Sequence, residues 1–125
     1  MSTAITQGIR ITVKGRFLPE QSGVGRYAFA YTVRIENLGP VAAQLKSRHW
    51  IITDANGQVE EVRGQGVVGE TPSLAPGERF EYRSWAMLKT PFGTMRGSYT
   101  FMRPDGSTFD ARIGEFALTL PNSLN

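Results

Sequence analysis

Large apolar side chains recur at every second position between Arg26 and Asn37, and this alternation limits the fold more than any other feature. The five side chains concerned are Tyr27, Phe29, Tyr31, Val33 and Ile35. A period of two places them on one face of a β-strand, whereas a helix would scatter them around its circumference. Aromatic and β-branched residues also suit a pleated surface. The segment is therefore predicted to be a strand.

Turn signals divide the rest of the chain into six further strand-like segments. They cover residues 9–17, 41–53, 58–63, 78–88, 95–102 and 108–120. Asp54-Ala55-Asn56-Gly57 predicts a hairpin, since Asn-Gly readily adopts positive φ. Residues 19–25 and 64–77 are rich in turn formers and are predicted to be connectors, and residues 121–125 a polar tail. The segment 41–53 is long enough to contain a bulge, and Gly114 marks a second candidate bulge.

The chain of 125 residues is predicted to be one all-β domain, residues 1–125, because no window has helical periodicity. About seven short strands favour an antiparallel β-sandwich of immunoglobulin or fibronectin type III character. A small β-barrel is the main alternative. Trp50 fits the core tryptophan of such sandwiches, and Tyr99 resembles a tyrosine corner without its cysteine.

Composition excludes several classes of protein. There is no cysteine, which rules out disulfide scaffolds and thiolate metal sites. No apolar stretch approaches the ~18 residues of a membrane span, so no membrane insertion is expected. The formal net charge of +3 is too small to imply a nucleic-acid or membrane partner by itself. The expected compartment is the cytoplasm.

The string Gly64-Gln65-Gly66-Val67-Val68-Gly69 matches the G-x-G-x-x-G spacing of dinucleotide-binding turns. That motif needs a helix after it, and the two prolines in residues 70–77 cannot supply one. Gly64, Gly66 and Gly69 are therefore predicted to bend a connector. A loop of backbone amides can still cradle an anion, which makes these three glycines the candidate anion-binding loop.

Neither a metal site nor a catalytic centre is expected. The only histidine is His49, and Glu60 and Glu61 should point to opposite faces of their strand. Glu70 in the glycine connector supplies a single carboxylate. No nucleophile, base and orienting group occur in a recognisable context. The sequence predicts no catalytic residue, no cofactor and no enzyme activity.

Arginine and tryptophan alternate in two strands, as Arg48 with Trp50 and Arg83 with Trp85. Such a pattern suits a nucleic-acid stacking platform or a protein interface. Glu81 on the same face as Arg83 weakens the nucleic-acid interpretation. Arg83 and Trp85 are therefore the candidate interaction surface for a protein partner that the sequence does not identify. Exposed strand edges leave the oligomeric state open.

The segments Arg26–Gly39 and Arg48–Phe101 closely resemble the ApaG family, through the G-x-G-V-V-G string, L-A-P-G-E and T-P-x-G-x-M-x-G. One departure is Tyr82-Arg83-Ser84-Trp85, where the family would have something nearer Tyr-Thr-Ser-Gly. The resemblance implies a fibronectin type III-like sandwich. It also implies a bacterial protein linked to cobalt resistance and magnesium efflux, with related domains in eukaryotic F-box and polymerase-interacting proteins.

Together these features predict a non-enzymatic, soluble protein-interaction domain. Its effect on Co²⁺ or Mg²⁺ would be that of an accessory factor, because a chain without a membrane span cannot carry an ion across a bilayer. The alternative is a binder of pyrophosphate or another small anion through Gly64–Gly69, a role the family string has also invited.

Overall fold

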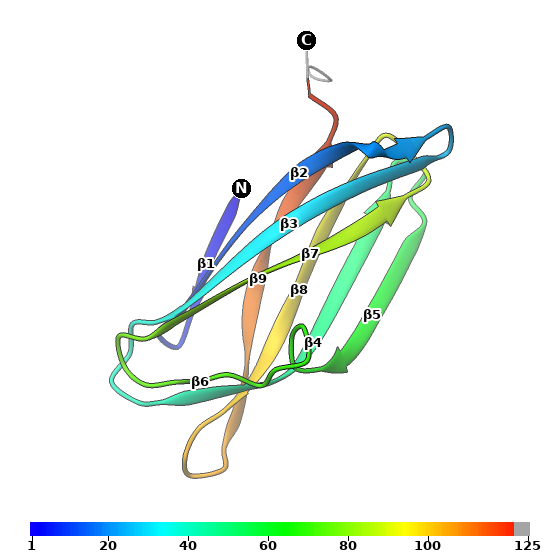
Figure 1. Ribbon diagram of the computed structural model, residues 1–125. Coiled ribbons are helices and arrows are strands. Elements are labelled where there is room, and N and C mark those ends of the chain that lie inside the picture. The colour runs from blue at the N-terminus through cyan, green and yellow to red at the C-terminus, as the bar shows by residue number, and fades with distance from the viewer. Residues whose placement is uncertain (122–125) are drawn as a thin grey trace.

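The computed structural model describes residues 1–121, and these form two antiparallel β-sheets packed face to face (Figure 1). No helix within these residues is long and apolar enough to cross a membrane. The strands are β1 (Ser2–Thr6), β2 (Ile9–Gly23), β3 (Arg26–Asn37), β4 (Ala43–Asp54), β5 (Val59–Gln65), β6 (Ser73–Leu74), β7 (Arg79–Leu88), β8 (Phe92–Met102) and β9 (Thr108–Thr119).

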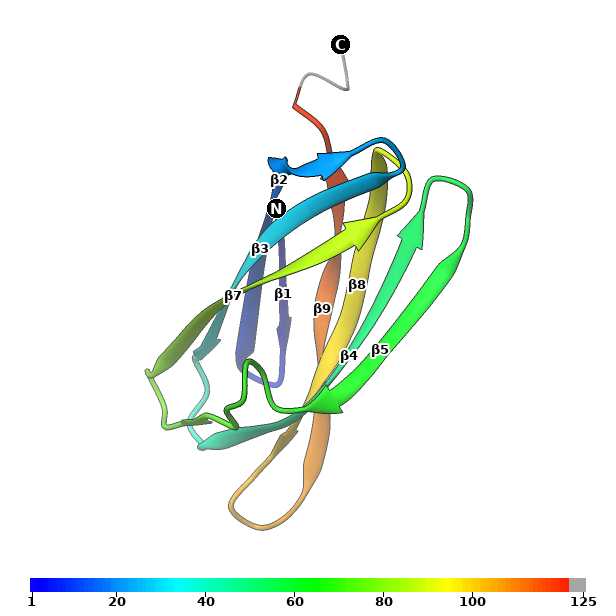
Figure 2. The ribbon, with the colours of Figure 1, turned by 45° about the vertical axis from the view of Figure 1, so that its right-hand side comes forward.

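The first sheet has the order β1-β2-β3-β7, and the second has the order β5-β4-β8-β9 with β6 paired to β4. The predicted all-β sandwich is confirmed. On one side of the sandwich, β1 and β2 of the first sheet contact β9 of the second. On the other side, β5 and β7 each pair with one neighbour only, so their outer edges are free (Figure 2). The molecule is thus closed along one side and open along the other.

The structure has two strands that the sequence did not predict, and several strands are longer than predicted. β8 begins at Phe92 rather than Met95, and β5 runs to Gln65, so Gly64 lies in a strand and not in the predicted connector. β1 carries few large apolar residues, and it forms because its backbone pairs with β2, from Ser2 opposite Val13 to Thr6 opposite Ile9. β6 is a two-residue strand inside the predicted connector, held by the burial of Leu74. β2 continues past Phe17 to Gly23 across an irregular register. The predicted tail at residues 122–125 lies outside the described residues.

Two bulges determine which side chains enter the core. In β4 the register shifts between Leu45 and Ser47, so Leu45 and Trp50 are both buried although they are five positions apart, a spacing that puts side chains on opposite faces of a regular strand. In β9 two residues, Gly114 and Glu115, oppose one residue of β8. Because side chains alternate along a strand, one extra residue moves the following side chains to the other face. Both predicted bulges are therefore present.

The core of the open side is aromatic. Tyr31 and Tyr82 come from the first sheet, and Trp50 and Tyr99 come from the second. The ring centroids of Tyr31 and Trp50 are 5.3 Å apart, and those of Trp50 and Tyr99 are 6.1 Å apart in an edge-to-face arrangement. Trp50 is only 2% exposed, which confirms it as the core tryptophan.

The hydroxyl groups of Tyr82 and Tyr99 form a buried hydrogen bond between the two sheets. The predicted tyrosine corner is wrong in this respect, because such a corner bonds a backbone group near its own strand. Burial raises the pKa of both hydroxyls well above the ordinary value for tyrosine. Both groups are therefore neutral, and one donates to the other without the cost of a buried charge.

We predict strong coupling between these two hydroxyls. Tyr99→Phe leaves the hydroxyl of Tyr82 buried without its partner, which costs about 1–3 kcal/mol of unfolding free energy. Tyr82→Phe should cost a similar amount, and the double variant should cost clearly less than the sum of the two. Urea unfolding of the four proteins measures this, and additive losses would contradict the hydrogen bond as the link between the sheets.

Candidate functional site

The outer face of the first sheet has ion pairs at one end only. The guanidinium of Arg10 donates to both carboxylate oxygens of Glu36 at 3.0 Å, and this bond lowers the pKa of Glu36. Arg34 on β3 lies opposite Glu81 on β7, and its Nε is 3.3 Å from a Glu81 carboxylate oxygen. These acidic groups are therefore already paired with arginines.

The other end of the same face carries basic side chains without such partners. Strand register places Lys14 and Arg83 on either side of Thr32, and Arg16 and Trp85 on either side of Ala30. Within residues 1–121 no ion pair involves any of the four basic residues at this end: Lys14, Arg16, Arg26 and Arg83. Their positive charge is available to a partner.

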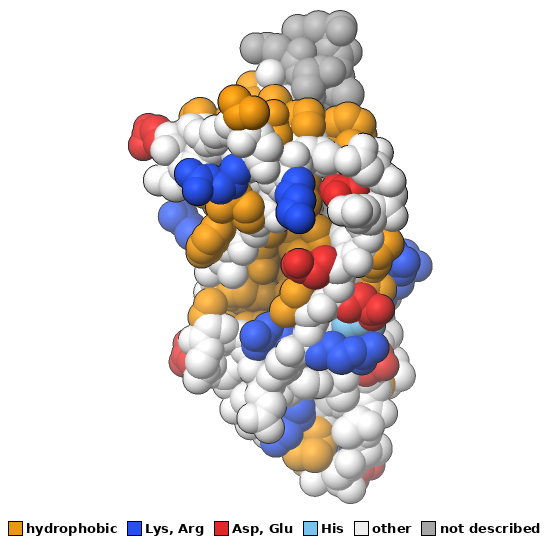
Figure 3. Space-filling view, turned by 90° about the vertical axis from the view of Figure 1, so that its right-hand side faces the viewer, with side chains coloured by type: hydrophobic (Ala, Val, Ile, Leu, Met, Phe, Trp, Pro, Cys, Tyr) orange, Lys and Arg blue, Asp and Glu red, His pale blue; other side chains and the backbone are white. Residues whose placement is uncertain are grey.

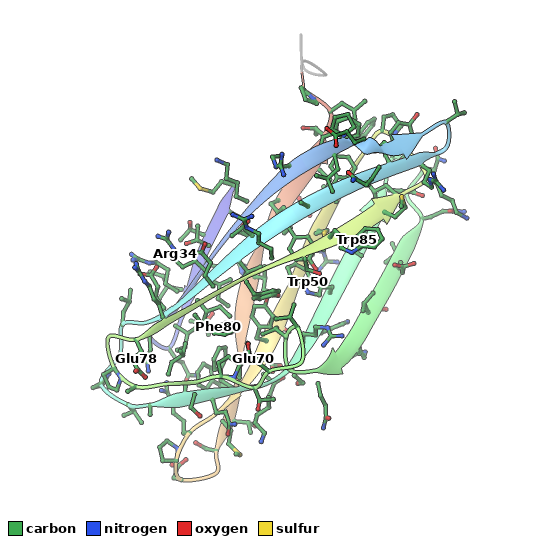
Figure 4. All side chains as sticks on the ribbon, in the orientation of Figure 1. Arg34, Trp50, Glu70, Glu78, Phe80 and Trp85 are labelled. Atoms are coloured by element: carbon green, nitrogen blue, oxygen red, sulfur yellow. The ribbon has the colours of Figure 1, made fainter. Side chains whose placement is uncertain are left out.

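Apolar side chains lie among these charges. A groove of about 630 Å³ opens there, lined by Leu18, Ala30, Trp85 and Met87 together with Arg26 and Arg83. Trp85 is 62% exposed and Met87 is 41% exposed. Figure 4 shows the indole of Trp85 on β7, away from the ion pair of the labelled Arg34. We call these six residues the basic groove, and it contains both residues of the predicted interaction surface.

The candidate anion-binding loop is organised by Arg48. The Nη1 of Arg48 donates to the carbonyl oxygens of Gln65 and Gly66, at 2.8 and 2.9 Å. A Cβ on Gly64 would lie 2.7 Å from Nη2 of the same guanidinium. A larger residue at position 64 would therefore have to displace the guanidinium of Arg48.

The rest of the glycine string is a tight turn. Val67 and Glu70 exchange backbone hydrogen bonds, and the two residues between them have positive φ, 43° at Val68 and 80° at Gly69. This is the pattern of a type I′ turn, which favours glycine. A Cβ on Gly66 would collide with the carbonyl oxygen of Glu70. The string opens no helix, as the sequence predicted.

Most donors of this loop are already used. The amides of Gly66, Val67 and Glu70 donate to carbonyl oxygens of Lys46, Glu70 and Val67, respectively. A backbone nest for an anion needs successive free amides that converge on one point. All three glycines thus have a structural role that requires no ligand.

The acidic and histidine side chains do not assemble into a metal centre. His49 Nε2 lies 2.7 Å from a carboxylate oxygen of Glu61, on the outer face of the second sheet. Glu60 lies on the opposite face of β5, as its position predicted. Glu70 ends the exposed turn. Residues 1–121 contain no group of three or more side chains with metal-ligand chemistry.

Comparison with known proteins shows the family of this chain. The family model described as the ApaG domain matches residues 19–103. The chain belongs to the ApaG family. A protein named ApaG from Anaeromyxobacter dehalogenans strain 2CP-C is 58% identical over 125 residues and is matched along its whole length.

Solved structures of ApaG relatives share this architecture. The crystal structure of a Bordetella pertussis protein described as ApaA is 52% identical, with a TM-score of 0.89 over 92% of this chain and 95% of that one. A second X-ray structure is 47% identical, with a TM-score of 0.90 over 98% of this chain and 94% of the other. The fold of this ApaG chain is thus that of its solved relatives.

Sequence reasoning identified Arg83 and Trp85 but missed the basic residues of the neighbouring strands. Lys14, Arg16 and Arg26 come from β2 and β3, and only the strand order brings them beside β7. The alternation of charges in residues 9–17 was the available signal. It shows that basic residues share a face, but not which strand lies next to them.

We predict that the loss of unfolding free energy from each alanine substitution in the glycine string depends on the backbone geometry at that position. Gly66→Ala combines a left-handed φ with a collision, and it should cost more than about 2 kcal/mol of unfolding free energy. Gly69→Ala has open space and should cost about 1 kcal/mol, like Gly57→Ala, which has the same left-handed backbone in the distant hairpin. Denaturant unfolding provides the measurement. Equal losses at Gly66 and Gly57 would contradict a structural role.

Proposed function

We propose that this ApaG chain is a non-enzymatic protein-interaction domain whose basic groove binds an acidic segment bearing a large apolar side chain. One observation supports the proposal above all others. Four basic side chains without ion partners among the described residues lie near the exposed Trp85 and Met87. At the far end of the same face, Arg10 and Arg34 are each paired with a glutamate.

The residue types suit a protein partner. Tryptophan and arginine are enriched at interfaces, where a central aromatic anchor supplies most of the binding energy. The free positive charges attract an acidic segment and orient it, since complementary charge accelerates association. An apolar side chain of the partner would then displace water from the space between Leu18 and Trp85.

A protein fits the groove better than a nucleic acid does. Nucleic-acid platforms offer successive aromatic rings for stacking and a continuous positive track for phosphates. This groove has one tryptophan among aliphatic side chains. The positive track also ends where Glu81 and Glu36 begin on the same face. A flexible phosphate backbone longer than the groove would meet these carboxylates.

In this proposal, the effect on cobalt and magnesium is exerted by the partner protein. The resemblance to the family implies an effect on both cations, and we place this chain as an accessory factor that modulates a partner. Binding through the basic groove needs no metal ligand on this chain. We place the interaction in the cytoplasm, with which the absence of cysteine agrees.

Binding of pyrophosphate or a nucleotide by Gly64–Gly69 is the alternative function. It would rely on the exposed turn at Val68 and Gly69, because the neighbouring amides are already bonded. Such a ligand would gain one or two backbone donors and no basic side chain from the groove. We therefore assign the proposed function to the basic groove and not to the glycine loop.

We predict that Trp85→Ala abolishes capture of a specific partner. Crosslinking of the full chain in native extract at low salt should recover a protein with an acidic segment. The variant should recover at least about tenfold less of that protein. Arg83→Ala should weaken capture and reduce its salt dependence. Phe92→Ala is the matched control, since it removes an exposed aromatic ring outside the groove.

Three outcomes would count against the proposal. An equal loss of partner capture with Phe92→Ala would show that capture does not depend on the groove. Recovery of nucleic acid in place of a protein would favour the stacking interpretation. Pyrophosphate-dependent shifts of the Val68 and Gly69 amides, in a chain that captures no partner, would favour the glycine loop.

A further inference from the structure

A second recess lies on the open side of the sandwich, between the free edges of β5 and β7. Its volume is about 400 Å³, and Figure 3 shows it as a hollow with an apolar floor and charged side chains at its rim. It lies on the inner side of β7, whereas the basic groove lies on the outer face. We call it the inter-sheet cleft.

The inter-sheet cleft has opposite charges at its two ends. Along β4 the inward side chains are Arg48, Trp50 and Ile52, and their partners on β5 are Gly64, Val62 and Glu60. Arg48 and Glu60 are therefore separated by four residues of strand, which is ~13 Å. Between them the walls are mixed: Trp50, Val62, Trp85 and Met95 are mainly apolar, and Tyr31 and Ser84 also line the cleft.

Arg48 is a half-buried charge without a carboxylate partner. No ion pair within residues 1–121 includes it. Among the hydrogen bonds of the described residues, its guanidinium donates only through Nη1, to two backbone carbonyls. Tyr31 lines the same cleft, and burial raises the pKa of its hydroxyl, a rise that the hydrogen bond with Ser84 and the positive charge of Arg48 partly oppose. A partly desolvated guanidinium of this kind gains from an anion that the protein does not provide.

We propose that the inter-sheet cleft binds a small aromatic carboxylate. The carboxylate would accept hydrogen bonds from Arg48, and the flat ring would lie against the exposed indole of Trp85, with the nearly buried Trp50 in the adjoining wall. The charges of Arg48 and Glu60 favour a monoanion over a phosphate. A single guanidinium with one nitrogen already engaged matches one carboxylate, and Glu60 at the mouth repels a dianion more strongly.

This site adjoins the proposed protein interface, because Ser84, Trp85 and Met87 line both, but its Arg48 end belongs to the inter-sheet cleft alone. Ligand in the inter-sheet cleft would fix the position of the indole that the partner contacts. The two proposals remain separable because ligand binding is measured with the purified full chain alone. A chain that captures its partner but binds no carboxylate would overturn only the present inference.

The two tryptophans of the chain both line the inter-sheet cleft, so their indole N–H signals in ¹⁵N NMR report on it directly. We expect saturable shifts of both signals with indole-3-acetate. The neutral indole-3-acetamide should bind at least about tenfold more weakly, because it lacks the charge that pairs with Arg48. Equal binding of the two compounds, or a Trp50 signal that does not move, would overturn the proposal.

Charge variants on β5 provide a matched pair. Glu60→Gln removes the negative charge at the mouth and should tighten indole-3-acetate binding about twofold at low ionic strength. Glu61→Gln removes the same charge from the opposite face, beside His49, and should leave the affinity unchanged. Val62→Phe narrows the cleft and should abolish the shifts in a chain whose other signals stay native. Equal effects of the two glutamine variants, or retained binding in Val62→Phe, would contradict this location.

Discussion

The buried hydrogen bond between Tyr82 and Tyr99 is the contact on which the open side of this sandwich depends. The closed side is held by contacts of β1 and β2 with β9, but no strand joins β5 to β7. There the sheets are held by aromatic side chains that meet between them. Because tyrosine combines a large apolar ring with a neutral hydroxyl, it fills the gap and satisfies its own polar atom.

Because β5 and β7 do not pair, β7 is an edge strand, and its two faces carry different kinds of side chain. Its inner side supplies Tyr82 to the core, and its outer side presents Arg83 and Trp85 to the basic groove. A sheet closed into a barrel would have buried this edge. The free edge instead lets the indole of Trp85 border both the groove and the inter-sheet cleft.

Local patterns in the sequence were sufficient to predict the sandwich but not the full candidate site. Alternation in residues 26–37 predicted which face is buried, and the long segment containing Trp50 predicted a bulge. Arg83 and Trp85 were identified because they lie on one strand. The basic residues of β2 depend on pairing between distant segments, and the contact of Arg48 with the glycine loop depends on how β5 returns beside β4. Periodicity within one segment carries no information about such pairings.

The central claim is that this family member works through the outer face of β7, and amide hydrogen exchange of the captured complex tests it most directly. We predict slower exchange in β7 and the adjoining parts of β2 and β3, with the 64–70 turn and the outer face of β9 unchanged. Protection concentrated in the 64–70 turn, with β7 exchanging as in the free chain, would contradict the account.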